Sequence, residues 1–80
     1  MPFPIEVDCR PDHGGEPTPL ALRLGLASVT VKALADSWGG RDHHYFKLVG
    51  EDDATYIVRH DPPSGLWALV FYDSGQGRAR

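Results

Sequence analysis

The sequence predicts an all-β domain, either a small twisted antiparallel meander or an SH3-like half-barrel of about five strands. The main observation is a series of three apolar and aromatic stretches, which read HHYFKLV, ATYIVRH and LWALVFY. Two turn clusters rich in Gly, Pro and Asp separate them, at residues 50–53 and 61–65. Such regular alternation is typical of antiparallel strands that are joined by tight turns.

Composition limits what the chain can be. Eighty residues are enough for one domain, and 41% hydrophobic with 24% charged residues is ordinary for a globular protein. A net charge of −3 argues against a general binder of phosphate backbones, which normally has clustered Lys and Arg. The single cysteine, Cys9, cannot form an internal disulfide, and the first residues lack the pattern of a signal peptide. We therefore expect a cytoplasmic protein without a membrane segment.

Residues 1–19 are expected to form a Pro/Gly-rich arm. They hold five of the seven prolines, and each proline removes a backbone hydrogen-bond donor. Only residues 5–9 alternate between apolar and polar side chains, so we predict at most a short edge strand there. The single β domain then spans 20–73, and 74–80 is expected to be a flexible tail.

Residues 20–34 predict a first hairpin. A turn at residues 24–25 would place Leu22 opposite Ala27. After Val31 the pattern leaves two alternatives open, because β-branched residues favour a strand to about residue 34 whereas the following helix formers allow one short helix over 31–38. The strand is our prediction.

Residues 43–60 predict a second hairpin, with a loop over 50–53. Val49 would then pair with Ala54, and His43 would lie opposite His60. If the alternation of side chains in this hairpin continues into residues 66–72, one face of the sheet forms the expected core. Its members are His44, Phe46, Leu48, Thr55, Ile57, Arg59, Trp67, Leu69 and Phe71. The opposite face is mixed in polarity, which favours curling into a barrel, a covering segment or contact with another subunit.

The spacing of aromatic and turn residues resembles a family of small, uncharacterised bacterial β domains. The matching positions are Trp38, Tyr45-Phe46, Tyr56-x-Val58-x-x-Asp61 and Gly65-x-Trp67-x-Leu69. Similar segments also look like the C-terminal extension of some Y-family DNA-polymerase-like proteins. The resemblance covers residues 16–73 and implies a compact β domain without an assigned activity or catalytic residues.

The chain departs from that family pattern at two turns. Relatives tend to be basic and aromatic around the position of Gly25, and an Asp-Gly turn is usual where this chain has Asp53-Ala54. The first departure weakens the inference of nucleic-acid binding that the polymerase-like resemblance would suggest.

Histidine and cysteine residues are the candidates for a metal site. These are Cys9, His13, His43, His44 and His60. Neighbouring strand residues point to opposite faces, so the best pair is His43 with His60 across the second hairpin. No CxxC or HxxxH spacing supports this metal site, which we keep as an alternative, and we expect no metal and no other cofactor. Neither Cys9 nor any serine has a predictable base beside it, so we expect no enzymatic activity.

The mixed face carries the strongest binding candidates. They are Tyr45, Tyr56, Tyr72 and Lys47, to which we add Arg59 from the opposite face, because it could form a cation–π pair with Trp67. Partly exposed aromatic side chains gathered on one sheet face mark an interface, so we expect a protein partner or a second copy of the chain in a homodimer. The alternative is an accessory domain that binds single-stranded nucleic acid by stacking bases on Tyr45 and Tyr56 beside Lys47.

Overall fold

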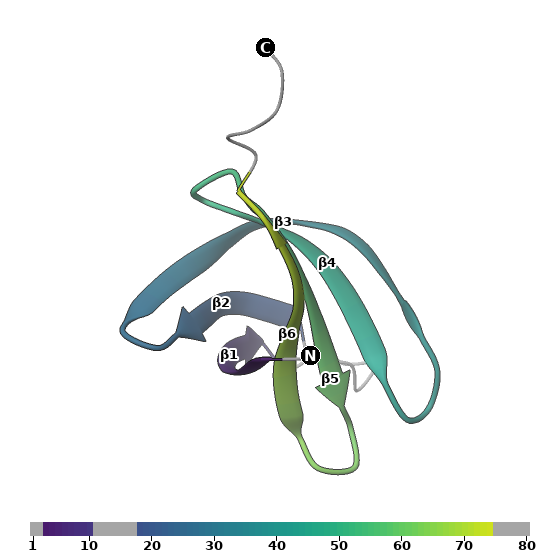
Figure 1. The fold of residues 1–80 in the computed structure, drawn as a ribbon. Coiled ribbons are helices and arrows are strands. Elements are labelled where there is room, and N and C mark those ends of the chain that lie inside the picture. Colours follow the sequence, from purple (N-terminus) through teal and green to yellow (C-terminus); the bar gives the residue numbers. More distant parts are fainter. Residues whose placement is uncertain (1–2, 11–17, 75–80) are drawn as a thin grey trace.

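The chain folds into a closed barrel of six antiparallel strands, described by a computed structural model over residues 3–10 and 18–74 (Figure 1). The strands are β1 (Phe3–Arg10), β2 (Thr18–Leu24), β3 (Ala27–Gly39), β4 (His44–Gly50), β5 (Thr55–Asp61) and β6 (Leu66–Asp73). The predicted all-β class is confirmed, with one strand more than the five expected. Nothing in these ranges is helical, so they include no helix that could cross a membrane.

β1 closes the barrel between β2 and β6. Its second half pairs with β2, where Val7 lies opposite Leu22, and its first half pairs with β6, where Ile5 lies opposite Trp67. The sequence predicts an edge strand at 5–9, but this strand has a neighbour on each side. Because the two halves pair with different strands, each half keeps one free edge, which is where a strand tolerates a proline such as Pro4. The expected arm at 1–2 and 11–17 and the expected tail at 75–80 lie outside the described residues.

β3 is the longest strand and belongs to two parts of the barrel. Its residues 27–30 pair with β2, and Val31 to Gly39 pair with β4 (Figure 1). Two bulges interrupt the second part, between Val31 and Ala33 and between Leu34 and Asp36. From Val31 onwards, β3 has no second neighbour within the described chain, so that edge of its backbone is open. The helix allowed over 31–38 is therefore wrong: pairing with β4 outweighs the helix propensity of four or five residues.

The first hairpin differs from the predicted register by two residues. Leu22 lies opposite Val29, and Leu24 lies opposite Ala27. The turn is centred one residue later than predicted, and Gly25 has the left-handed φ of 68° that suits a glycine. A shift of two residues keeps every side chain on its face, so Leu22 still points into the barrel, where it is fully buried.

The second hairpin differs by one residue, and this reverses the faces of β5. Val49 lies opposite Thr55 instead of Ala54, and His44 instead of His43 lies opposite His60. The loop holds one residue more because Asp53 adopts a left-handed φ of 65° and Ala54 N donates to the Asp52 carboxylate at 3.1 Å. β5 therefore points its other set of side chains into the barrel.

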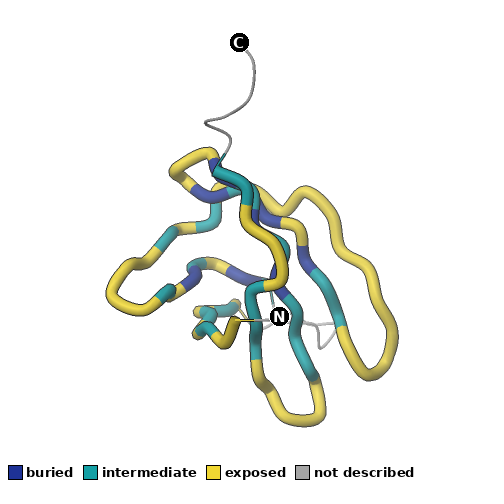
Figure 2. Tube along the Cα trace, viewed as in Figure 1, coloured by how far each residue is buried: buried dark blue, intermediate teal, exposed yellow. Residues whose placement is uncertain are grey.

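The core that results is small. Six apolar residues in the described part of the chain are buried (Figure 2), and partly buried residues of β1, β2, β3 and β6 pack around them. The six are Leu22, Phe46, Leu48, Ala54, Tyr56 and Val58. The predictions for Phe46 and Leu48 are confirmed, whereas Thr55, Ile57 and Arg59 point outward instead of into the core.

A bulge in β6 completes the rearrangement. Leu69 lies opposite Val58, but two residues later Phe71 lies opposite Ile57, because the register shifts between Ile57 and Val58. Trp67 and Leu69 pack against the core, as predicted. Phe71 is 47% exposed and lies on the outer side of the sheet, so its predicted core position is wrong.

Candidate functional site

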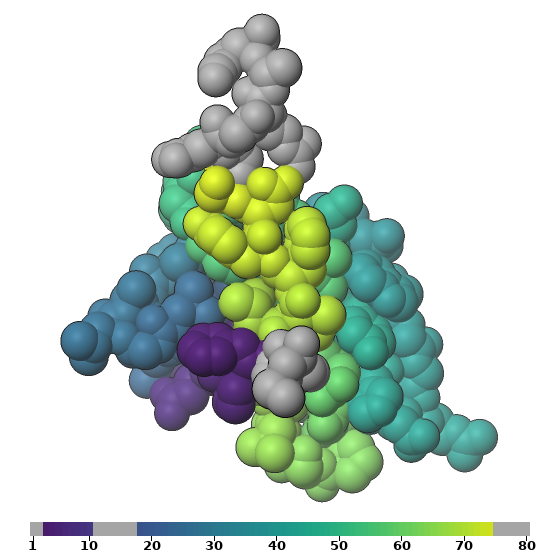
Figure 3. All heavy atoms as spheres, in the orientation of Figure 1, coloured from purple at the N-terminus to yellow at the C-terminus, as the bar shows by residue number. Residues whose placement is uncertain are grey.

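Four strands, β3 to β6, bring six side chains together on the outside of the barrel. We call this set the outer aromatic face: Trp38, Tyr45, Lys47, Ile57, Arg59 and Phe71. Cross-strand partners share a face of a sheet. One row of partners runs from Trp38 through Tyr45 to Arg59. The next row begins at Asp36 on β3 and runs through Lys47 and Ile57 to Phe71. In Figure 3 the β6 side chains lie at the surface, beside β1.

Two aromatic rings form one end of this face. The rings of Trp38 and Tyr45 stack with their centroids 5.6 Å apart and their planes within 5°. Trp38 stands at the end of β3 and is 42% exposed. Next to it, Gly39 has a φ of 132°, and a Cβ there would lie 2.5 Å from the carbonyl oxygen of His43. A glycine is therefore required for the chain to turn into β4 and present Trp38 beside Tyr45.

The two cations of the face have different surroundings. Lys47 is exposed and makes no hydrogen bond or ion pair with the described part of the chain. Arg59 is largely covered, and its Nε lies 3.3 Å from Asp61 Oδ1, an ion pair whose geometry falls short of a hydrogen bond. The same Asp61 oxygen is 2.8 Å from His43 Nδ1, which joins the β3–β4 loop to the end of β5.

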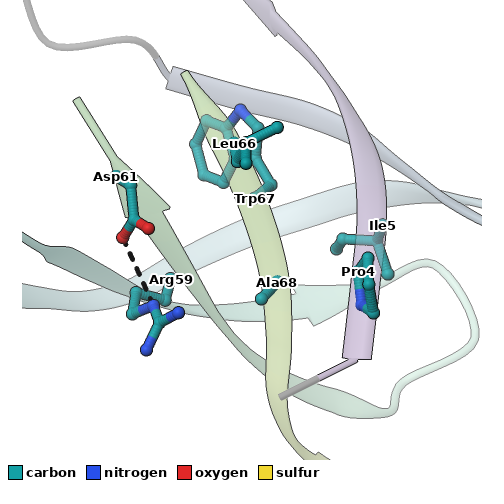
Figure 4. A pocket seen from close by; sticks show the side chains of 7 residues that line it. All are labelled: Pro4, Ile5, Arg59, Asp61, Leu66, Trp67 and Ala68. Carbon is teal, nitrogen blue, oxygen red and sulfur yellow. Dashed lines mark ion pairs between the residues drawn. The ribbon is translucent and has the colours of Figure 1, made fainter. Parts of the chain in front are cut away.

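A pocket of about 290 Å³ adjoins the face where β5, β6 and β1 meet (Figure 4). It is lined by Pro4, Ile5, Arg59, Asp61, Leu66, Trp67 and Ala68. Apolar side chains form most of its wall, and the Arg59–Asp61 pair forms one side. Its volume is near the lower limit for small-molecule pockets, which is the scale of one or two side chains.

The predicted binding residues divide between the two sides of the sheet. Tyr45, Lys47 and Arg59 meet on the outer aromatic face. Tyr56 is only 2% exposed and fills the core, so it cannot contact a partner from the surface. Tyr72 is 52% exposed but lies opposite Tyr56 on the inner side, and the two ring centroids are 5.1 Å apart.

The suggested metal pair is not brought together as predicted. His43 lies in the loop against Asp61, and His60 pairs with His44 across the hairpin, with its ring 4.4 Å from that of Trp67. Over residues 3–10 and 18–74, no group of three or more His, Cys, Asp or Glu could hold a metal ion. His13 lies outside these ranges. Burial, and secondarily the charge of Asp8, raises the pKa of Cys9, which disfavours the thiolate form.

Three important residues were misplaced or undervalued by sequence reasoning. Ile57, Arg59 and Phe71 were all assigned to the core face, but they lie on the outer aromatic face. The departure from an Asp-Gly turn at Asp53-Ala54 is the one signal that could indicate the longer loop. Nothing in the apolar run of β6 marks the bulge that turns Phe71 outward.

Comparisons with protein-family models, with curated proteins and with solved structures find no match to this chain.

Proposed function

We propose that this chain is a non-enzymatic interaction module that binds a protein, either a partner or a second copy of itself, through the outer aromatic face. The observation that carries the proposal is the combination on one sheet face of exposed rings, an aliphatic residue and an unpaired cation. A stacked pair such as Trp38 and Tyr45 offers a large and rigid contact area at small entropic cost.

The distribution of apolar side chains supports this proposal. The described residues include nine exposed large hydrophobic side chains, whereas their buried core holds six apolar residues, one of which is only an alanine. Several of the nine are scattered singly, as on any protein surface, whereas Trp38 and Phe71 belong to one continuous face. Burial of such a face against a partner would add apolar contacts that the small core does not supply.

Charge favours a protein over nucleic acid. The net charge of the chain is −3, and both Arg23 and Lys32 are paired with a carboxylate. The buried position of Tyr56 also removes one of the two rings on which the nucleic-acid alternative depends. A fluorescent oligonucleotide titrated at low ionic strength separates the two functions, because binding to phosphates weakens steeply as salt is added. We place the module in the cytoplasm, since its one cysteine gives no disulfide framework.

Self-association is tested by light scattering over a concentration series. The variant Trp38→Ser/Phe71→Ser removes two apolar groups from the face, and Leu20→Ser/Leu26→Ser removes two exposed leucines elsewhere. If the wild type dimerises, we expect the first pair to weaken the dimer by about ten-fold or more and the control pair to have little effect.

A partner of a different sequence is tested by photo-crosslinking in cells. A benzophenone amino acid placed at Phe71 is compared with one at Leu26, the most exposed apolar position. We expect a discrete cross-linked protein at position 71 only, and its loss when Lys47→Glu is added. A wild-type monomer with the same cross-linking background at both positions would overturn the proposed function.

A further inference from the structure

We propose that the pocket between β1, β5 and β6 receives an apolar side chain of a partner protein whose neighbouring residue carries a carboxylate, and that Arg59 binds this carboxylate. The inference rests on the proposed function, because the ligand is a segment of the protein that the outer aromatic face binds.

The shape of the pocket selects a single apolar group. Pro4 and Ile5 bound it from β1, and Leu66, Trp67 and Ala68 bound it from β6 (Figure 4). At about 290 Å³ it holds a leucine- or phenylalanine-sized side chain better than a larger ligand. Transfer of such a side chain from water to these walls is favourable in proportion to the apolar area that is buried.

Charge complementarity selects the carboxylate. Arg59 uses Nε toward Asp61, and its two terminal nitrogens make no hydrogen bond or ion pair with the described residues. In Figure 4 these nitrogens point away from Asp61. Two parallel N–H groups of a guanidinium match the two oxygens of a carboxylate. The side chain of Arg59 is only 27% exposed, so an ion pair formed there is less weakened by water than one on the open surface.

Asp61 positions the arginine for this contact. Its Oδ1 is shared between Arg59 Nε and His43 Nδ1, at 3.3 and 2.8 Å. Held at Nε, the guanidinium keeps its terminal edge available for a partner. The negative charge of Asp61 also disfavours a more highly charged anion such as a phosphate beside the arginine.

Arg59 links the pocket with the proposed interface. It lies directly opposite Tyr45, whose ring is stacked on that of Trp38. A partner segment that places an apolar side chain in the pocket would thus extend over the aromatic pair. One continuous surface would then bind an apolar residue and an acidic residue of the partner at the same time.

The experiment is a titration of the ¹⁵N-labelled full chain with short blocked peptides. Acetyl-Leu-Glu-amide is compared with acetyl-Leu-Gln-amide, acetyl-Leu-Lys-amide and acetyl-Gly-Glu-amide. For ligands of this size we expect saturable shifts at about millimolar concentration, centred on the indole N–H of Trp67 and the amide of Ala68. The Leu-Glu peptide should bind at least about five-fold more tightly than the other three.

Two variants test the assignment against a matched control. Arg59→Gln should weaken the Leu-Glu peptide about ten-fold and remove its advantage over Leu-Gln. Ala68→Leu should fill the pocket and weaken all leucine peptides alike. Arg41→Gln removes an exposed arginine from the β3–β4 loop, outside the pocket, and should change none of the affinities.

Several results would overturn the inference. Equal binding of the Leu-Glu and Leu-Lys peptides, or no shifts at Trp67 and Ala68, would exclude recognition of a carboxylate in the pocket. If 4-methylpentanoate binds there and the Leu-Glu peptide does not, the pocket takes a free small acid instead of a protein segment. In each case cross-linking at position 71 would still test the proposed function separately. If Arg59→Gln does not fold, Ala68→Leu and the peptide series decide the matter.

Discussion

At the scale of single residues, Tyr56 connects the core with the loop that sets the register of β5. Its ring is buried, and its hydroxyl donates to Asp52 Oδ2 at 2.7 Å. The other oxygen of Asp52 accepts the backbone N–H of Ala54. The hydrogen bond from Tyr56 is the main cause of a pKa of Asp52 below its ordinary 3.8, while burial and then Asp52 raise the pKa of Tyr56. The same contacts therefore stabilise both the loop and the inward position of the ring.

Replacement of Tyr56 by Phe should lower the free energy of unfolding at pH 7 by about 1 kcal/mol, because it removes this hydrogen bond. The folded-state pKa of Asp52 is depressed, so its contribution is present above pH 3.8 and is lost as the pH falls through the folded value. Urea unfolding at pH 7 and pH 3 should thus show a smaller difference between Tyr56→Phe and wild type at the lower pH. The effect of pH is small, since Asp52 is exposed.

Tyr72→Phe is the control for this prediction. The ring of Tyr72 contacts that of Tyr56, but its hydroxyl forms no hydrogen bond within the described chain. The free energy of unfolding of Tyr72→Phe should lie within about 0.5 kcal/mol of the wild-type value at both pH values. Equal losses in the two variants would mean that the Tyr56–Asp52 hydrogen bond does not stabilise the fold.

Tyr56 also shows how far the sequence can predict this site. The aromatic positions and both turns can be predicted from residue types, and Tyr45 and Lys47 were placed on one face, as in the structure, whereas Arg59 was assigned to the core face. The sequence does not predict which side chains of a strand point inward, because one added loop residue reverses the two faces of the strand that follows. Asp53 has a left-handed conformation, which an aspartate tolerates but does not require, so the residue type alone does not predict it.

At the scale of elements, pairing with β4 determines that the second half of β3 is a strand and not a helix. Residues 32–35 are good helix formers, yet they form a strand because β4 offers a continuous row of backbone hydrogen-bonding groups. Local propensity spans only tenths of a kcal/mol per residue, so tertiary pairing overrides it easily. The length of β3 could not be predicted for the same reason. Its end at Gly39 depends on the conformation of the following loop.

Gly39→Ala should destabilise the protein by about 1–3 kcal/mol, because the new Cβ would meet backbone atoms and the φ of 132° suits only glycine. Gly40→Ala is a matched control one residue away, where an added Cβ meets nothing within 4 Å. Chemical denaturation should separate the two variants clearly. Identical midpoints would show that the β3–β4 loop relaxes without cost and that Gly39 does not fix the position of Trp38.

At the scale of the whole molecule, the barrel depends on contacts between the two ends of the described chain. Phe3, Pro4 and Ile5 pair with Leu69, Ala68 and Trp67. The sequence predicts the all-β class from local patterns, but closure brings together residues that are more than 60 positions apart, and no local pattern records such a contact. The proline-rich composition of residues 1–19 also pointed away from a strand there.

Removal of residues 1–10 should abolish cooperative unfolding, because it deletes β1 and leaves the paired edges of both β2 and β6 without a neighbour. A domain of this size has a small stability margin and cannot lose one of six strands. Circular dichroism during heating measures the transition. Removal of residues 75–80 takes away none of the described strand pairings and is the control truncation. A sharp melting transition in the chain that lacks residues 1–10 would show that the fold does not require β1.

The open edge of β3 has a consequence for how the protein behaves at high concentration. An unpaired strand edge is a template on which another chain can extend a sheet without limit. The two bulges in β3 break the regular spacing of its backbone groups, and the charge of Asp36 lies at the second of them. An approaching strand therefore finds only short stretches in register. We therefore expect this edge to resist open-ended pairing with other chains.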